Sequence, residues 1–264
     1  TVAHIEGGDV TGTIDESVRH AITKLSHFHF VTNEESHRRV LQMGESPAYV
    51  FNVGSPDIEF AAHISRKPGS DALNTMGVGG RIDFSKPYIM AIQHPVTSEP
   101  GNLENVLKTM EAVGELGIQA LWFWPNPDAG TDEISGGIRR FREASSARHI
   151  RFVIDLHPEE FIALLKHAAC LVGNSSSGIK EASFLGVPVV DIGTRQRGRA
   201  RAGNVAGVGY DKEAIKAAIK KQLSHGRYSP SMMYYKPETS KRIRKILKTA
   251  PLYTQKQFFD TPTS

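Results

Sequence analysis

The sequence predicts an α/β protein made of two Rossmann-like, doubly wound domains, the first of them incomplete. Three observations lead to this fold class. From residue 86 onward, short apolar runs alternate with amphipathic stretches, the pattern of a parallel sheet covered by helices on both faces. A shorter series of the same kind precedes it. Residues 69–81, rich in Gly, Ser and Asn, separate the two series and are predicted to form a loop or hinge.

The second series is regular, because each expected strand is followed by an expected helix. The strands are expected at residues 88–93, 120–124, 151–155, 170–172 and 187–192, and the helices at 102–116, 132–143, 158–167, from near Ser177, and at 212–223. Residues 81–225 are therefore predicted to be a nucleotide-binding domain. Residues 226–264 are expected to form a helical tail that packs back on the first domain.

The first series supplies only half a sheet. Its strands are expected at residues 2–5, 29–32 and 49–53, and its helices at 15–25 and 33–43. A doubly wound nucleotide domain usually has about six strands. The chain also begins with Thr1 in place of a methionine, directly before a strand. Residues 1–80 are therefore expected to be the C-terminal half of an N-terminal domain plus the hinge.

The composition is that of a globular protein, with 39% hydrophobic and 23% charged residues in a chain of 264. The formal charge of +4 favours an anionic partner without choosing among nucleotide, nucleic acid and acidic surface. The single cysteine, Cys170, excludes an internal disulfide, and its apolar neighbours predict a packed core thiol in preference to a nucleophile. Neither a membrane-spanning apolar run nor a secretory leader is evident, so a cytoplasmic location is expected.

The strongest candidate for chemistry is the segment GNSSSGIKE at residues 173–181, which follows a strand and opens a helix. Free backbone N–H groups, the helix dipole and the serine hydroxyls are suited to a phosphate there. Glu181 falls about one turn into the helix, where its carboxylate could hold a pair of ribose hydroxyls. The alternative is a helix N-cap with small residues that allow tight packing.

Three arginines follow the next strand, namely Arg195, Arg197 and Arg199. Ligands of open α/β sheets bind at the carboxyl ends of the strands, and arginine forks match phosphate oxygens. The serine segment and the arginine segment are therefore expected to hold one diphosphate. Surface salt bridges are an equal alternative for Arg197 and Arg199.

His94 stands at the end of the second domain's first strand, in the stretch QHPVT. At that end a histidine can donate to a phosphate or move a proton. A purely structural histidine is the alternative.

Carboxylates gather in the first series, where HIEGG places Glu6 at the end of a strand and Asp15 and Glu16 begin the next helix. Paired carboxylates across a cleft can serve as acid and base. The alternative is that Asp15 caps the helix while Glu16 stabilises its dipole.

Taken in order, the blocks HIEGG, TGTIDESVRHAITK, GSP, QHPVT, PNPDAG, GNSSSGIKEASFLGVPVVDIGTRQRGR and GNV resemble the hydrolysing UDP-N-acetylglucosamine 2-epimerases of sialic acid synthesis. The resemblance covers nearly the whole chain. It implies two domains of the glycosyltransferase-B type and an anti elimination of UDP from UDP-GlcNAc, followed by hydration to N-acetylmannosamine. It also implies that neither NAD nor a metal is needed, which agrees with the lack of a GxGxxG loop and of clustered metal ligands in the sequence.

The resemblance also assigns roles to residues. It implies that Glu6, Asp15 and Glu16 match acid/base carboxylates and that His94 matches a histidine near the departing diphosphate. It implies that Ser175, Ser176 and Arg195 bind phosphate, Glu181 the ribose, Leu156 the uracil through its backbone, and Asn126 another part of the nucleotide. The expected partner is a UDP-sugar, with no cofactor, no nucleic acid and no membrane, in a homodimer or homotetramer.

Other functions remain open at this point. The alternatives are a hydrolysing epimerase of a UDP-diacetamido-trideoxy sugar of the legionaminic type, a non-hydrolysing UDP-GlcNAc 2-epimerase, a transferase of the same fold, and a binding module without catalysis. The family's first strands carry a catalytic Asp and further nucleotide contacts, and no counterpart occurs here. The chain by itself is therefore expected to bind UDP weakly and to be inactive.

Overall fold

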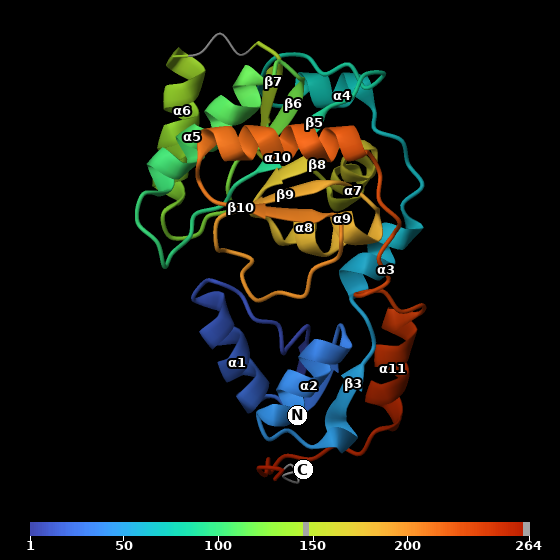
Figure 1. The fold of residues 1–264 in the computed structure, drawn as a ribbon. Coiled ribbons are helices and arrows are strands. Elements are labelled where there is room, and N and C mark those ends of the chain that lie inside the picture. Colours follow the sequence, from blue (N-terminus) through green and yellow to red (C-terminus); the bar gives the residue numbers. More distant parts are fainter. Residues whose placement is uncertain (145–147, 261–264) are drawn as a thin grey trace. The chain divides into compact units, whose positions relative to one another are not determined.

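The computed structural model describes residues 1–144 and 148–260, and the chain forms two compact units (Figure 1). The first unit contains Thr1–His63, Gly198–Ala200 and the chain from Ser231 on. The second contains Ile64–Arg197 and Arg201–Pro230. The fold of each unit is α/β with parallel strands, as the sequence predicts.

The second unit is built on a seven-stranded sheet with the order β10-β9-β8-β5-β6-β7-β4. Its strands are β4 (Val78–Gly79), β5 (Ile89–Ile92), β6 (Ala120–Phe123), β7 (Ile150–Val153), β8 (Cys170–Gly173), β9 (Val189–Ile192) and β10 (Val205–Val208). Strands β5 to β10 pair in parallel, and only β4 runs antiparallel, against β7. The chain extends outward from β5 on one side through β6 and β7, and on the other through β8 and β9. The switch point therefore lies between β5 and β8, where open sheets bind ligands.

Helices cover both faces of this sheet (Figure 1). They are α4 (Ser70–Thr75), α5 (Asn102–Glu115), α6 (Thr131–Ala144), α7 (Pro158–His167), α8 (Ser176–Ile179), α9 (Glu181–Phe184) and α10 (Lys212–His225). Side chains alternate along β5, so that Ile89 and Ala91 join the core under α5, α6 and α10, whereas Met90 and Ile92 join the core under α7 and α9. A strand that is apolar on both sides suits a doubly covered sheet.

The first unit has a three-stranded parallel sheet in the order β1-β2-β3. Its elements are β1 (Ala3–Ile5), α1 (Asp15–Leu25), β2 (Phe28–Val31), α2 (Glu34–Gln42), a 3₁₀ turn (Pro47–Tyr49), β3 (Val50–Asn52), α3 (Pro56–His63) and α11 (Thr239–Thr249). Phe28 and Phe30 of β2 pack with Ile243 of α11, whereas Val31 packs with Val40 of α2. The central strand is thus buried on both faces here too.

A buried ionic cluster lies beside this sheet. The Glu45 carboxylate accepts hydrogen bonds from Lys24 Nζ at 2.7 Å and from His29 Nε2 at 3.0 Å, and pairs with Lys256 Nζ at 2.6 Å. Lys256 also donates to the carbonyls of Thr23 and Lys24 at the end of α1. Its positive charge stabilises the carboxyl end of that helix. Burial lowers the pKa of His29 to about 4.

Residues 69–81, predicted as a loop or hinge, instead contain α4 and β4, so that prediction of their secondary structure is wrong. The backbone of this segment is held by side chains. Asn74 bonds both the N–H and the carbonyl of Ile82 at 2.9 Å, and the Arg151 guanidinium donates to the carbonyls of Leu73 and Asn74, at 3.1 and 2.7 Å. Arg151 lies about 75 residues away in sequence, so local composition could not show this.

Two other elements, α3 and β10, lie outside the predicted set. Strand β10 reads VAGV, with a glycine that lowers strand propensity. Its pairing with β9 comes from the register of the sheet rather than from its own sequence. In the described part of the chain, the model contains no helix that combines the length and the apolar character of a membrane span.

Candidate active site

Five of the predicted site residues follow the carboxyl ends of five neighbouring strands in the second unit. These are His94 after β5, Asn126 after β6, Leu156 after β7, Ser175 after β8 and Arg195 after β9. Because these strands are parallel, all five lie at the same edge of the sheet. His94 and Ser175 flank the switch point.

His94 is only 6% exposed and is held on three sides. Its backbone N–H donates to Asn174 Oδ1 at 2.7 Å, and its carbonyl accepts from Asn174 Nδ2 at 2.9 Å. Its ring Nδ1 lies 3.2 Å from the backbone N–H of Asn126, which can only donate. Burial, and secondarily the positive charge of Arg195, lowers the pKa of His94 to about 4. The ring is thus neutral near pH 7, with its proton on Nε2, where it can serve as a donor.

Asn174 lies outside the predicted set of site residues, yet it connects three of the strand ends. Its side chain holds His94, and its own carbonyl accepts from Gln196 Nε2 at 2.8 Å and from Arg195 Nη1 at 3.3 Å. The preceding Gly173 has φ of +127°, and a Cβ there would lie 1.9 Å from the Ile92 carbonyl oxygen. Only glycine allows β8 to approach β5 this closely. The glycine and the asparagine of the motif GNSSSG are visible in the sequence, but the prediction assigned phosphate binding to the serines and no role to the asparagine.

The serine segment forms a cap in this structure. The side chain of Ser175 accepts from the backbone N–H of Ser177 at 3.3 Å and from Ser177 Oγ at 2.9 Å. Helix α8 has one turn and begins at Ser176. The N-cap alternative is therefore present, and Ser176 lies at the first helical position. Glu181 was expected about one turn into a single helix, and instead it begins α9, after a break at Lys180.

The guanidinium of Arg195 lies near the carboxyl ends of the strands, where it donates to the Asn174 carbonyl. Its guanidinium is largely buried and lies 3.9 Å from Asp128 Oδ2, in the loop after β6. Asp128 is a contact that the sequence did not reveal, although it belongs to the quoted stretch PNPDAG. Of the other two arginines of this loop, Arg197 is exposed.

Asn126 and Leu156 make their hydrogen bonds through the backbone. The Asn126 carbonyl accepts from the backbone N–H of Asp128 at 2.8 Å, and its side chain is exposed. The backbone N–H of Leu156 donates to Asp155 Oδ1 at 2.8 Å. Any backbone contact of Leu156 to a ligand would therefore come from its carbonyl unless Asp155 moves.

Glu6, in the first unit, has an unusual backbone conformation, with φ of +66° directly after β1. Positive φ is uncommon outside glycine and is often found at functional sites. Its backbone N–H donates to the Phe30 carbonyl at 2.8 Å, and its carboxylate accepts from Ser55 Oγ at 2.5 Å. Strand β2 thus holds the backbone of Glu6, and the loop after β3 holds its carboxylate.

Asp15 and Glu16 begin α1, but Asp15 is not its cap. The N-cap is Ile14, which makes no side-chain cap bond, and Asp15 accepts from Thr13 Oγ1 at 3.1 Å. The capping interpretation of Asp15 is therefore wrong. Glu16 accepts from the backbone N–H of Thr11 at 2.6 Å and so holds the loop that leads from Glu6 to α1. The Asp15 side chain is left exposed.

A buried ion pair in the first unit joins Asp9 and Arg199. Asp9 Oδ2 lies 3.2 Å from Arg199 Nε, and the two side chains are only 4% and 7% exposed. Asp9 Oδ1 accepts from Ser36 Oγ at 2.7 Å. Arg199 therefore forms a salt bridge, but a buried one in place of the surface salt bridge named as the alternative. Asp9 directly follows the HIEGG stretch, and its role depends on Arg199, which is 190 positions away in sequence.

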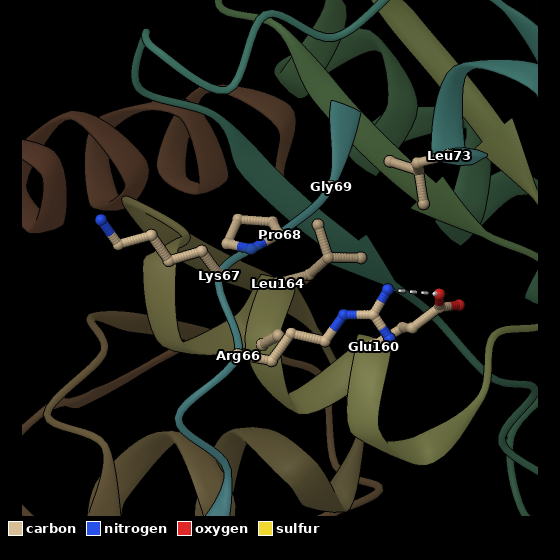
Figure 2. A pocket seen from close by; sticks show the side chains of 8 residues that line it. Arg66, Lys67, Pro68, Gly69, Leu73, Glu160 and Leu164 are labelled. Carbon is tan, nitrogen blue, oxygen red and sulfur yellow. Dashed lines mark ion pairs between the residues drawn. The ribbon is translucent and has the colours of Figure 1, made fainter. Parts of the chain in front are cut away.

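The small hollow in Figure 2 is not this site. Arg66, Lys67, Pro68, Gly69, Leu73, Glu160, Ala163 and Leu164 line it, and the Arg66 and Glu160 side chains approach to 3.6 Å. Its volume of about 30 Å³ suits a single water. None of the predicted site residues lines it. Within residues 1–144 and 148–260, no three His, Cys, Asp or Glu side chains are grouped as metal ligands.

The second unit, with polar residues after the carboxyl ends of its parallel strands, has the architecture of a nucleotide-binding α/β protein. A family model described as UDP-N-acetylglucosamine 2-epimerase matches residues 1–248. The chain belongs to the UDP-N-acetylglucosamine 2-epimerase family, in agreement with the resemblance of its motifs.

Two curated relatives are similar over nearly the whole chain. The UDP-N-acetylglucosamine 2-epimerase of Neisseria meningitidis is 33% identical over 269 residues, which cover 98% of this chain and 68% of the relative. The UDP-N,N'-diacetylbacillosamine 2-epimerase (hydrolyzing) of Legionella pneumophila is 34% identical over 255 residues, which cover 96% of this chain and 66% of the relative. The chain thus spans about two thirds of the length of these relatives.

Solved structures share the fold at low sequence identity. The Methanocaldococcus jannaschii UDP-GlcNAc 2-epimerase in complex with UDP-GlcNAc and UDP aligns with a TM-score of 0.74 at 18% identity, covering 94% of this chain and 69% of that one. The Neisseria meningitidis enzyme bound to UDP-GlcNAc gives the same TM-score and identity, covering 94% and 70%. These likenesses show a fold of the glycosyltransferase-B type.

Proposed function

We propose that the protein is a hydrolysing UDP-GlcNAc 2-epimerase that converts UDP-GlcNAc and water into N-acetylmannosamine and UDP, for sialic acid synthesis. Family membership supports an epimerase of UDP-GlcNAc. The relatives described as hydrolyzing support the hydrolysing subtype. The observation that carries the proposal is Glu6, a carboxylate held in a left-handed backbone conformation at the end of a strand.

The proposed reaction has two balanced steps. In the first, a base takes the proton from C2 while the bond between C1 and the diphosphate oxygen breaks. The C–H electron pair becomes the C1=C2 double bond, and UDP leaves with the electrons of the broken bond. In the second step, water gives one proton to a carboxylate as its oxygen bonds to C1 of 2-acetamidoglucal. The electron pair of the C1=C2 double bond takes up a proton at C2, on the face opposite to the one from which the first proton was removed.

The carboxylates of the first unit are the groups proposed to move these protons. Glu6, Asp15 and Glu16 are ionisable, and their backbones are held by strand β1 and helix α1. Positioned carboxylates typically contribute a factor of about 10² to 10⁴ to such proton transfers. The removal of the proton from C2 and the later addition of a proton to C2 are proposed to be shared among these three carboxylates.

The second unit is proposed to bind the nucleotide. A neutral His94 with its proton on Nε2 can donate to the departing diphosphate without needing to be charged, and Arg195 supplies positive charge. Ser175 and Ser176 are proposed to bind phosphate, Glu181 the ribose, and Leu156 and Asn126 the rest of the nucleotide. The protein's partner in this proposal is a UDP-sugar, and the assembly is a homo-oligomer.

A second candidate substrate is a UDP-diacetamido-trideoxy sugar. The Legionella pneumophila relative named for UDP-N,N'-diacetylbacillosamine is 34% identical, practically the same as the 33% of the Neisseria meningitidis relative. The chemistry at C1 and C2 is the same for both sugars. They differ at C4 and C6, so the choice depends on contacts to those positions.

The test is carried out on the complete gene product that contains this chain. It is incubated in D₂O with UDP-GlcNAc or with UDP-N,N'-diacetylbacillosamine, and the sugars are followed by proton NMR. N-acetylmannosamine with deuterium at C2, together with free UDP, is the expected result. UDP-N-acetylmannosamine as the lasting product would indicate the non-hydrolysing reaction, and turnover of only the diacetamido sugar would favour the second candidate. UDP release that requires an added acceptor would point to a transferase.

A further inference from the structure

One buried asparagine, Asn174, links three loops at the ligand edge of the second unit through its side chain and its backbone. The Asn174 side chain is fully buried and pairs with the backbone of His94 on both sides, as acceptor at 2.7 Å and as donor at 2.9 Å. Its backbone N–H donates to the Ile92 carbonyl at 3.0 Å, and its carbonyl accepts from Arg195 and Gln196. The loops after β5, β8 and β9 therefore share this residue.

We propose that Asn174 is a positioning residue of the active site, whose buried side-chain amide holds the His94 backbone, and with it the Asn174 backbone carbonyl that accepts from Arg195, in the arrangement that receives the diphosphate. This inference rests on the proposed function. Asn174 itself need not touch the substrate, because it acts through the two residues that it holds.

The geometry gives a physical reason for an asparagine at this position. An amide offers one acceptor and two donors, which matches the N–H and the C=O of one extended residue. Aspartate could accept from the His94 N–H but would oppose its carbonyl with a second acceptor, and would add a negative charge near the diphosphate. Serine is too short to make both bonds at once.

The position of the His94 ring follows from this backbone clamp. With its backbone fixed by Asn174, the ring places Nδ1 at 3.2 Å from the Asn126 N–H, which selects the neutral form protonated on Nε2. If the clamp is lost, the ring can turn away from Asn126, and the preference for one tautomer should disappear. The tautomer therefore reports on positioning without any substrate.

The chain offers a matched control in Asn204. It is also a buried asparagine of the second unit, and its side chain also accepts one hydrogen bond, from Ser183 Oγ at 2.8 Å, and donates one to a backbone carbonyl, that of Val187 at 2.7 Å. Among the described residues, its side chain bonds Ser183 and Val187 and bonds neither His94 nor Arg195. Replacing either asparagine removes a comparable buried amide.

The experiment compares Asn174→Ala with Asn204→Ala in the present chain. Long-range ¹H–¹⁵N spectra of the histidine rings give the His94 tautomer at pH 7, and calorimetry gives the affinity for UDP. We expect wild type and Asn204→Ala to show the Nε2-protonated form and equal affinities. Asn174→Ala should show mixed tautomers and about 10-fold weaker UDP binding, the size expected when a buried hydrogen-bonded group is lost.

The proposal is overturned if wild-type His94 is protonated on Nδ1, or if Asn174→Ala keeps the single tautomer and binds UDP as Asn204→Ala does. If Asn174→Ala does not fold, Asn174→Ser, which retains one of the two bonds, is assessed by the same criteria. If wild type shows the Nε2-protonated ring but binds no UDP, the proposed function fails for this chain. The tautomer comparison then still decides whether Asn174 positions His94.

Discussion

The two units carry opposite kinds of chemical groups at the ends of their strands. In the first unit the groups around the end of β1 are carboxylates, those of Glu6, Asp9 and Glu16, held by hydroxyls, backbone N–H groups and Arg199. In the second unit the strand ends carry a neutral histidine, amides and hydroxyls, with the Arg195 guanidinium beside Asp128. Neutral donors and a positive charge suit an anionic diphosphate, whereas carboxylates suit proton transfer. The difference supports the proposal that nucleotide binding belongs to the second unit and proton transfer to the first.

The largest expected effect is on catalysis and comes from the first unit. In the complete gene product, Glu6→Gln should lower kcat by a factor of about 10² to 10⁴, because an amide cannot take or give the proton. UDP affinity, measured by calorimetry, should change less than threefold if nucleotide binding belongs to the second unit. The matched control is Glu34→Gln, an exposed carboxylate of the same unit, which should leave kcat unchanged.

If Glu6→Gln lowered UDP affinity by the same factor as kcat, Glu6 would have a role in nucleotide binding. The proposed division of roles between the two units would then be wrong. Unchanged kcat would remove Glu6 from the proton transfers altogether.

The next effect is on stability and tests whether the charges of the first unit are really buried. Arg199→Met removes the cation that lies 3.2 Å from the buried Asp9 carboxylate, which keeps Ser36 and the electrostatic attraction of Arg19. Removing one partner of a buried pair typically costs about 3 to 5 kcal/mol. Chemical denaturation should show this loss for Arg199→Met, whereas Arg197→Met, two residues away and exposed, should change the free energy of unfolding by about 0.5 kcal/mol at most.

The double variant Asp9→Asn with Arg199→Met refines this result. With both charges gone, much of the lost stability should return, because the main cost is the unpaired charge. Equal losses in the single and double variants would mean that packing, and not charge, holds Gly198–Ala200 in the first unit.

Local patterns were enough to predict the parallel sheets and most of the helices. Strands such as β5 and β8 are continuous apolar runs, and the helices between them are amphipathic over ten or more residues. These apolar runs and helical periodicities can be recognised from the sequence alone, because they result from burial of the strands on two faces and of the helices on one. The fold class therefore follows from the sequence without knowledge of any long-range contact.

What the sequence could not show depends on single contacts between distant residues. The backbone of the segment around α4 is held by Arg151, and the pairing of Asp9 with Arg199 joins residues that lie far apart in the sequence. The site residues themselves stay predictions, because their roles need a ligand. Asn174 was missed for a different reason, since an amide among serines looks like part of a polar loop until its neighbours are known.

A smaller effect concerns pH and should appear in both units. The pKa of His94 and that of His29 are each lowered to about 4, mainly by burial. Above the usual histidine pKa of about 6.5, both states are neutral and stability is unaffected; as pH falls toward 4, the unfolded chain binds protons that the folded chain does not. Each ring should therefore cost on the order of 3 kcal/mol of stability between pH 7 and pH 4.

The measurement is the free energy of unfolding against pH for wild type, His94→Gln and His29→Gln. Each variant should remove one part of the pH-dependent loss below about pH 6.5. An unchanged slope in His94→Gln would contradict a neutral His94 and with it the donor role proposed for its Nε2.

The smallest effect is expected for the exposed charges of the second unit. Lys212 and Lys216 both bond Glu115, at 2.7 and 2.6 Å, and together they lower the pKa of that carboxyl to about 2. These distances between nitrogen and oxygen are shorter than the 3.2 Å between Arg199 and Asp9, but solvent and salt screen the charges of this exposed cluster. Glu115→Gln should therefore shift Tm, measured by calorimetry, by no more than about 1 °C. A shift several times larger would show that charge pairs stabilise the second unit as well, and that burial is not what separates the two halves.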